Sequence, residues 1–156
     1  QDFWRRRKRI HHKRMNNKIL KYTKSLMSKN YNALGFLPDT RLEEYIKNNQ
    51  LWLQYENDEP CGYIIHGNGF QVCKVYQCCI QTDARRKKSA SLLVDDLINK
   101  SRLRGSLFVS LWCAEDLESN NFWEALGFQF NGKRQGGSHR DRVHKNWVYD
   151  LDTKLI

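Results

Sequence analysis

Hydrophobic and polar positions in the first 50 residues follow the period of α-helices. Residues 2–30 contain no glycine or proline and many good helix formers, which predicts one long helix. An apolar stripe in its second half predicts that this half docks on the rest of the protein; the stripe comprises Ile19, Leu20, Tyr22, Leu26 and Met27. The stretch 34–49 predicts a turn and a second helix, with Asp39 or Thr40 as its N-cap.

The period then changes to that of β-strands, broken by two further helices. A hairpin is expected from strand Leu51–Tyr55, a turn over 57–60 and strand Cys61–His66, and a longer strand over 71–81. Next come a helix over 89–104 ended by Gly105, a strand over 106–114 and a short helix over 119–126 ended by Gly127. Two final strands, within 128–135 and 146–151, complete the pattern. The nearly continuous apolar character of 106–114 predicts a strand covered on both faces.

This order of elements predicts a mixed α/β domain in which the unit over 71–113 is parallel and right-handed. The 156 residues suit one domain, and we divide them into a helical arm, 1–30, and a globular domain, 31–156. The net charge of +10 falls entirely in the arm, which holds eleven Lys and Arg residues against one Asp. The remaining residues hold sixteen basic and sixteen acidic groups, so the domain is neutral.

Composition argues against several classes of protein. No apolar run approaches the roughly 20 residues that span a bilayer, and no signal-peptide core follows the basic start, so we expect a soluble, cytoplasmic protein without membrane contact. The five cysteines are odd in number and form no CxxC pair, which argues against a disulfide framework and a zinc site. We expect five reduced, mostly buried thiols, with adjacent Cys78 and Cys79 on opposite faces of one strand.

A basic run stands between the strand over 71–81 and the helix that follows. A helix start offers N–H donors without intrahelical partners and a partial positive charge, and small residues let an anion approach the backbone. The sequence therefore predicts a site for a phosphate-bearing ligand at this junction, and a solvated basic turn is the alternative. The residues concerned are Arg85, Arg86, Lys87, Lys88, Ser89, Ala90 and Ser91.

Two motifs resemble those of the GCN5-related N-acetyltransferase (GNAT) superfamily. The basic run resembles its acyl-CoA-binding pattern [Arg/Gln]-x-x-Gly-x-[Gly/Ala], with Arg85, Lys88 in place of the glycine, and Ala90. The stretch "NNFWEALGF" resembles the motif N-x-x-A-x-x-F-Y-x-x-x-G-F. There Phe122, Gly127 and Phe128 match, and Asp116 and Ser119 replace the usual Asn and Ala.

The resemblance implies a mixed, mostly antiparallel sheet of about six or seven strands with flanking helices. It also implies acetyl-CoA as co-substrate, with no metal, lying in a splay between the strands over 71–81 and 107–114. Pantetheine would pair with the backbone of the first strand and pyrophosphate with the start of the following helix. The implied cofactor-binding residues are Cys79, Ile80, Gln81, Arg85, Arg86, Lys87, Lys88, Ser89, Ala90, Ser91, Asn121 and Trp123.

Acetyl transfer from a thioester needs a neutral amine, a donor to the oxyanion and a proton for the leaving thiolate. Trp123 stands where the family has a proton-donating Tyr, and an indole is a poor acid; a core aromatic is its alternative role. The catalytic candidates are Tyr76, Cys113 and Asp116, each as the base. For Tyr76 and Cys113 the alternative is a place in the core, and for Asp116 it is to cap the helix over 119–126. Gln77 and Glu115 also lie at strand ends, whereas His66, His139 and His144 suit surface positions. Positioning with a water relay is the alternative to any single residue.

The function expected from these features is acetyl transfer to a primary amine of an unidentified acceptor. The alternatives are a non-catalytic acyl-CoA-binding module and a nucleic-acid-binding module of the same fold. Cations in the loop over 133–145 suit an acidic or phosphorylated acceptor, or merely solvent. The basic arm suits nucleic acid or an acidic partner, its alternative being a solubilising helix, and an oligomer is compatible with the sequence.

Overall fold

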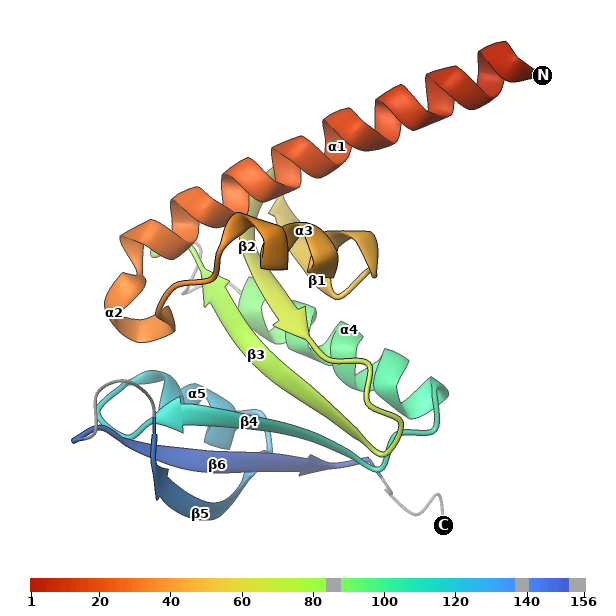
Figure 1. The fold of residues 1–156 in the computed structure, drawn as a ribbon. Coiled ribbons are helices and arrows are strands. Elements are labelled where there is room, and N and C mark those ends of the chain that lie inside the picture. Colours follow the sequence, from red (N-terminus) through yellow and green to blue (C-terminus); the bar gives the residue numbers. More distant parts are fainter. Residues whose placement is uncertain (84–87, 137–140, 152–156) are drawn as a thin grey trace.

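A six-stranded sheet lies between two layers of helices in the computed structural model, which describes residues 1–83, 88–136 and 141–151 (Figure 1). The helices are α1 (Asp2–Lys29), α2 (Tyr31–Leu34), α3 (Asp39–Lys47), α4 (Ser89–Leu103) and α5 (Ser119–Ala125). The strands are β1 (Leu51–Glu56), β2 (Glu59–His66), β3 (Val72–Ile80), β4 (Phe108–Ala114), β5 (Gln129–Gln135) and β6 (Val143–Asp150).

The strands follow the order β1-β2-β3-β4-β6-β5 across the sheet. Only the β3–β4 ladder is parallel among the five that the described strands form, and the others are antiparallel. The expected mixed, mostly antiparallel sheet with a parallel β3–α4–β4 unit is therefore confirmed.

The core has two parts, one on each face of the sheet. One contains the buried side chains of α4 and α5, and the other contains those of α1 and α3. Successive residues of β2 serve both parts, because Ile64 faces the first and Tyr63 and Ile65 face the second. Cys78 and Cys79 likewise pack on opposite faces, as expected.

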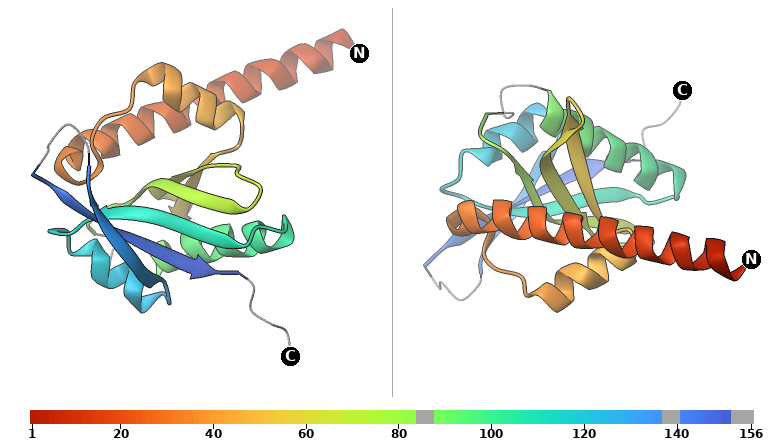
Figure 2. Two further views of the ribbon diagram at one scale, coloured as in Figure 1. Left: turned by 60° about the horizontal axis from the view of Figure 1, so that its bottom comes forward. Right: turned by 90° about the horizontal axis from the view of Figure 1, so that it is seen from above.

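Helix α1 begins at Asp2 and ends at Lys29, which confirms the single long helix. Its buried residues are Thr23, Leu26 and Met27, and its first half extends away from the domain (Figure 2). Leu26 and Met27 share a core cluster with Leu42 of α3, so the second half of α1 helps to build the domain. The division of the chain at residue 30 stays a prediction.

Three local expectations were wrong. The N-cap of α3 is Pro38, because Asp39 already lies in the helix and pairs with Lys24, Nζ to Oδ2, at 2.9 Å. The β1–β2 turn is tighter than expected: Asn57 and Asp58 have φ of 53° and 64°, values typical of a two-residue turn, and strand β2 starts at the next residue. Strand β4 is covered mainly on one face. Helices α4 and α5 pack there, whereas Trp112 is 39% exposed on the other.

Strand β5 forms an edge of the sheet and is mostly exposed, with polar side chains over most of its length. Among the described helices, none combines the length and the apolar character that crossing a membrane would require.

Candidate functional site

Strands β3 and β4 part in the middle of the sheet. Their ladder runs from the pair Val72–Phe108 to the pair Val75–Leu111, while β3 continues to Ile80 and β4 to Ala114. The two strands diverge beyond this last pair (Figure 1). The structure therefore contains the splay that the sequence resemblance implied.

A β-bulge lies at the point where the strands part. Gln77 faces Ile65 of β2, but the next pair is Val75 with His66, so Tyr76 is an additional residue in β3. A bulge bends its strand and re-aims side chains. The bend therefore lies beside the last β3–β4 pair and turns the second half of β3 away from β4.

Helix α4 begins shortly after β3 ends, with Lys88 as an exposed N-cap residue. No described side chain caps this helix start. The Ser89 hydroxyl is buried and donates to Oε2 of Glu56 at 3.1 Å, so it points toward the β1–β2 hairpin. Ala90 and Ser91 are half-buried in the first turn. The other predicted phosphate contacts, Arg85, Arg86 and Lys87, fall outside the described residues.

The predicted pantetheine contacts occupy the last part of β3 and the residue after it. Cys79 and Ile80 are buried, and Ile80 pairs with Gly62 of β2. The Gln81 N–H donates to the Cys61 carbonyl at 2.7 Å, which leaves the Gln81 carbonyl as its backbone group for a ligand.

Tyr76 points toward the α3 side of the sheet. Its side chain is about half exposed, and its ring centroid lies 5.8 Å from that of Tyr45. Its hydroxyl lies 2.8 Å from the position that a Cβ on Gly67 would occupy. The phenol therefore lies near the β2–β3 connection.

Cys113 and Asp116 lie on the other side of the splay, near α5 and β6. The Cys113 thiol is buried 3.3 Å from the Ser119 hydroxyl, and burial raises its pKa. Asp116 Oδ1 accepts from Arg142 Nε at 3.2 Å. The N-cap of α5 is Glu118, so the alternative of Asp116 as its cap was wrong. No contact among the described residues joins Tyr76 to either group.

The two α5 residues predicted to contact the cofactor differ in exposure. Trp123 is buried, with its ring centroid 4.9 Å from Phe122 and 5.3 Å from Phe128. Asn121 is exposed. Trp123 therefore packs in the core between the sheet and α5.

Sequence reasoning missed a polar connection between the sheet and α2. The Tyr63 hydroxyl donates to Gln77 Oε1 at 2.9 Å, and Gln77 Nε2 donates to the Leu34 carbonyl at 3.0 Å. Gln77 follows the bulge, so the connection fixes α2 relative to the splay. In the sequence, the one signal of this connection was that Gln77 is a polar residue in a mostly apolar strand.

A second missed connection runs through Arg142. Its Nη1 donates to the Asn32 carbonyl at 2.7 Å while its Nε binds Asp116. This side chain therefore joins α2, the β4–α5 connection and the start of β6. The sequence indicated a cationic loop but gave no means to choose this arginine.

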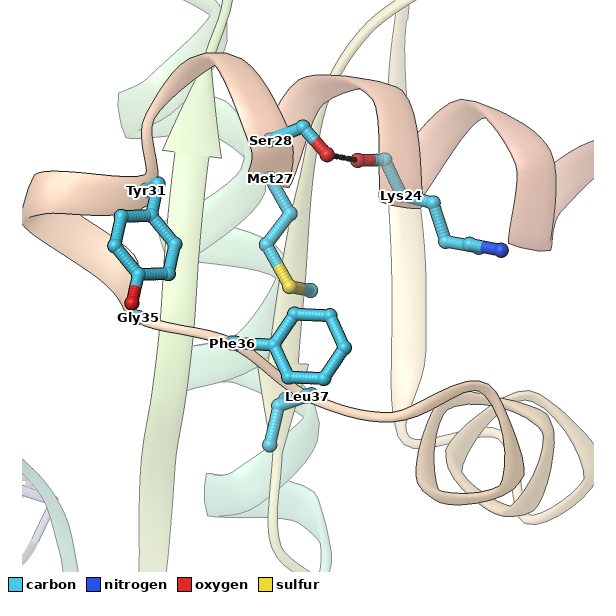
Figure 3. Close-up of a pocket in the computed structure, with 7 residues that line it drawn as sticks. All are labelled: Lys24, Met27, Ser28, Tyr31, Gly35, Phe36 and Leu37. Atoms are coloured by element: carbon cyan, nitrogen blue, oxygen red, sulfur yellow. Dashed lines mark hydrogen bonds between the residues drawn. The ribbon is translucent and has the colours of Figure 1, made fainter.

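A small pocket of about 60 Å³ lies between the end of α1 and the α2–α3 connection. Met27 points toward Phe36 there, while the Lys24 side chain extends away (Figure 3). The pocket is mainly apolar and lies on the α1 side of the sheet, apart from the start of α4.

His66 was expected at the surface and is fully buried. The Trp52 ring packs against it with centroids 4.5 Å apart, and its Nδ1 lies 2.9 Å from the Gly67 carbonyl. His144 is half-buried, and His139 lies outside the described residues. In the described ranges, no three His, Cys, Asp or Glu side chains gather as metal ligands would.

The sequence matches the family model of the acetyltransferase (GNAT) domain over residues 13–142. The chain belongs to this family. The comparison with curated proteins found no match.

Solved structures of acetyltransferases share the fold at low sequence identity. The chain is similar to Ard1 from Thermoplasma volcanium, at 14% identity and a TM-score of 0.74, covering 83% of this chain and 90% of that one. It is also similar to the aminoglycoside 6'-N-acetyltransferase from Enterococcus faecium, at 15% identity and a TM-score of 0.71, covering 88% and 93%. A third is an aminoglycoside 6'-N-acetyltransferase complexed with coenzyme A, at 13% identity and a TM-score of 0.72, covering 85% and 90%.

Membership of this family supports acyl-CoA-dependent N-acetyl transfer as the general activity of the chain. A coenzyme A complex among the structural neighbours is consistent with acetyl-CoA as co-substrate.

Proposed function

We propose that this chain transfers an acetyl group from acetyl-CoA directly to a primary amine. The observation that carries the proposal is the end of the β3–β4 ladder at Val75 and Leu111, followed along the chain by the start of α4. The end of strand pairing and the N-terminus of a helix therefore follow one another along the chain, an order that would suit a pantetheine arm followed by its pyrophosphate.

The cofactor would enter along β3 and end at α4. Pantetheine amides would pair with the backbone over 79–81, beyond the bulge. Pyrophosphate would lie at the first turn of α4, near Lys88, where the helix dipole favours negative charge. The basic run over 85–88 would attract the anion over a longer range.

The reaction would join the acceptor nitrogen to the acetyl carbon and break the carbon–sulfur bond. A backbone N–H of the segment after Tyr76 would donate to the oxyanion. Cys113, whose thiol lies 3.3 Å from the Ser119 hydroxyl, would donate a proton to the departing thiolate and would regain one, through water, from the acceptor amine. Asp116, in its ion pair with Arg142, suits orientation of the acceptor, and water would take the proton of the amine.

The names of the structural neighbours support an amine acceptor. They include acetyltransferases of an aminoglycoside amine and of the alanine of a ribosomal protein. Both reactions form an amide from an amine, although the two acceptors differ in size and class. We therefore propose the reaction type and leave the acceptor to a screen.

Calorimetric titration with acetyl-CoA tests the cofactor site. Lys88→Glu places a negative charge at the α4 start, and we expect about tenfold weaker binding, which corresponds to about 1.4 kcal/mol. The matched control is Lys74→Glu, an exposed position on the paired half of β3. Equal affinity in both variants, or no binding by the intact chain, would contradict the site.

A screen of amines with mass-spectrometric detection of acetylated product tests the reaction. Small amines, aminoglycosides and peptides with free N-termini should be included. Binding of acetyl-CoA without product from any amine would favour the non-catalytic acyl-CoA-binding module.

A further inference from the structure

The first half of α1 is a projecting helix that lies outside the proposed acetyl-transfer site. All residues over 2–18 are exposed, and the helix is buried only from Thr23 onward. At about 1.5 Å per residue, this segment, here called the overhang, extends roughly 25 Å. Figure 2 shows it leaving the domain toward the N-terminus.

The overhang carries positive charge in every direction around its axis. Residues 5–9 are five successive cations, and 3.6 residues complete a helical turn. With three more cations, it holds eight Lys and Arg residues against Asp2 alone. Ion pairs within the described part of the chain lie outside the overhang, for example at Lys24, Lys133 and Arg142. The overhang is therefore a solvent-exposed helix with cationic side chains all around its axis.

A lipid surface is a poor partner for such a rod. Helices that lie on membranes bury one continuous apolar face in the lipid and keep their charged residues on the opposite face. The large exposed apolar residues of the overhang are Phe3, Trp4, Ile10 and Met15. At about 100° per residue they form two pairs, Phe3 with Ile10 and Trp4 with Met15, and Arg7 and Arg14 lie between the pairs. The Arg7 guanidinium lies 5.6 Å from the centroid of the Phe3 ring, so it covers part of the apolar surface.

Double-stranded DNA fits these features better. A helix is about 10–12 Å in diameter with its side chains, and the major groove of B-DNA is about 12 Å wide with phosphates along both sides. A helix in this groove has phosphates on both sides and base edges at the floor of the groove. Cations on several faces of the helix suit this environment. The major groove of duplex RNA is too narrow for this arrangement.

We infer that the overhang is a DNA-binding element that lies in the major groove of duplex DNA. Arg5, Arg6 and Arg9 are exposed and lie within about 100° of one another around the helix axis, and this face contacts the phosphates. The inference is independent of the acetyl-transfer reaction, since the overhang contains none of the residues proposed to bind acetyl-CoA.

The test measures affinity for a fluorescent 20-base-pair duplex at several salt concentrations. Each phosphate contact contributes about −0.9 to the slope of log K against log salt concentration. Arg5→Gln, Arg6→Gln and Arg9→Gln combined should flatten this slope by about 2–3 and weaken binding at least tenfold in roughly 100 mM salt. Glutamine preserves helix propensity, and circular dichroism checks that α1 remains.

The matched control removes three exposed cations from the domain by Lys47→Gln, Lys74→Gln and Arg102→Gln. Both variants lose the same net charge, so a general electrostatic effect would flatten both slopes equally and overturn the inference. Tighter binding to duplex RNA, or binding to phosphatidylserine vesicles without binding to DNA, would also overturn it. Acetyl-CoA titration of the overhang variant should match the intact chain, which separates this result from failure of the acetyl-transfer site.

Discussion

Asn120 of α5 and Trp147 of β6 are joined inside the core by a hydrogen bond of 2.9 Å, from the indole Nε1 to Oδ1 of the amide. The same amide donates from Nδ2 to the carbonyls of Ala114 at 2.8 Å and Leu117 at 2.7 Å. One buried side chain therefore fixes the end of β4, the start of α5 and β6 relative to one another.

Replacing Asn120 with Leu should lower the free energy of unfolding by about 2–4 kcal/mol. The indole N–H of Trp147 would lose its partner in the core, and each buried group left unsatisfied costs about 1–3 kcal/mol. Denaturant unfolding measures the loss. The neighbouring exposed Asn121→Leu is the matched control and should change stability by less than about 0.5 kcal/mol. Similar losses in both variants would show that the buried network contributes little.

Gln77→Leu should destabilise the chain because the buried Tyr63 hydroxyl then lacks its acceptor. We expect a loss of about 1–3 kcal/mol. Adding Tyr63→Phe removes the hydroxyl that Gln77→Leu leaves without an acceptor. The double variant should therefore be more stable than the sum of the two single effects predicts. A double-mutant cycle from denaturant unfolding measures this coupling, and strict additivity would contradict the described connection.

Gly62→Ala should disturb the end of β3. A Cβ at this position would lie 2.6 Å from the Cys79 carbonyl oxygen and would also meet the Ile80 side chain. Overpacking of this kind costs about 1–3 kcal/mol. Because the displaced segment is the proposed pantetheine contact, acetyl-CoA affinity should fall as well. Glu59→Ala, at an exposed position on the same strand, is the control, and calorimetry with acetyl-CoA should give it the affinity of the intact chain.

Stability should fall as the pH drops below about 6.5, partly because of His66. Burial lowers the pKa of this imidazole, and the positive charges of Arg104 and Lys100 lower it further. The hydrogen bond to the Gly67 carbonyl raises the pKa, but the net shift is downward. The unfolded chain therefore binds a proton at a higher pH than the folded chain does, and the stability present above 6.5 is lost as the pH falls toward the folded pKa.

Comparison with His66→Gln isolates this contribution. The difference in unfolding free energy between the two proteins should change by up to about 1.4 kcal/mol per pH unit below 6.5. His144→Gln serves as the control, since this half-buried residue is less enclosed. Parallel pH curves for the intact chain and His66→Gln would refute the role of His66.

Local signals predicted the elements of the fold well. Residues 2–29 contain nothing that breaks a helix, and Gly105 and Gly127 follow the ends of α4 and α5 with φ of 85° and 97°. Such signals act within a few residues, so they can be read from the chain alone. The family motifs supplied the topology that joins these elements.

Contacts between distant segments explain most of the errors. His66 is buried because Trp52 packs on it, and Trp112 is half-exposed because α4 and α5 pack on the other face of β4. The bulge at Tyr76 arises from the register with β2. These features depend on neighbours that hydrophobic periodicity along one segment does not specify. The positions of Gln77 and Arg142 in the site have the same origin.

The exposed first half of α1 also governs how the protein behaves in solution. Residues 1–18 hold eight of the Lys and Arg residues and one Asp, so their removal lowers the net charge of +10 by seven, to +3. Trypsin attacks exposed basic segments, and a preparation nicked there would elute from a cation exchanger at lower salt than the intact chain. Because its net charge would be closer to zero, the nicked protein would also repel its own copies less and precipitate more readily.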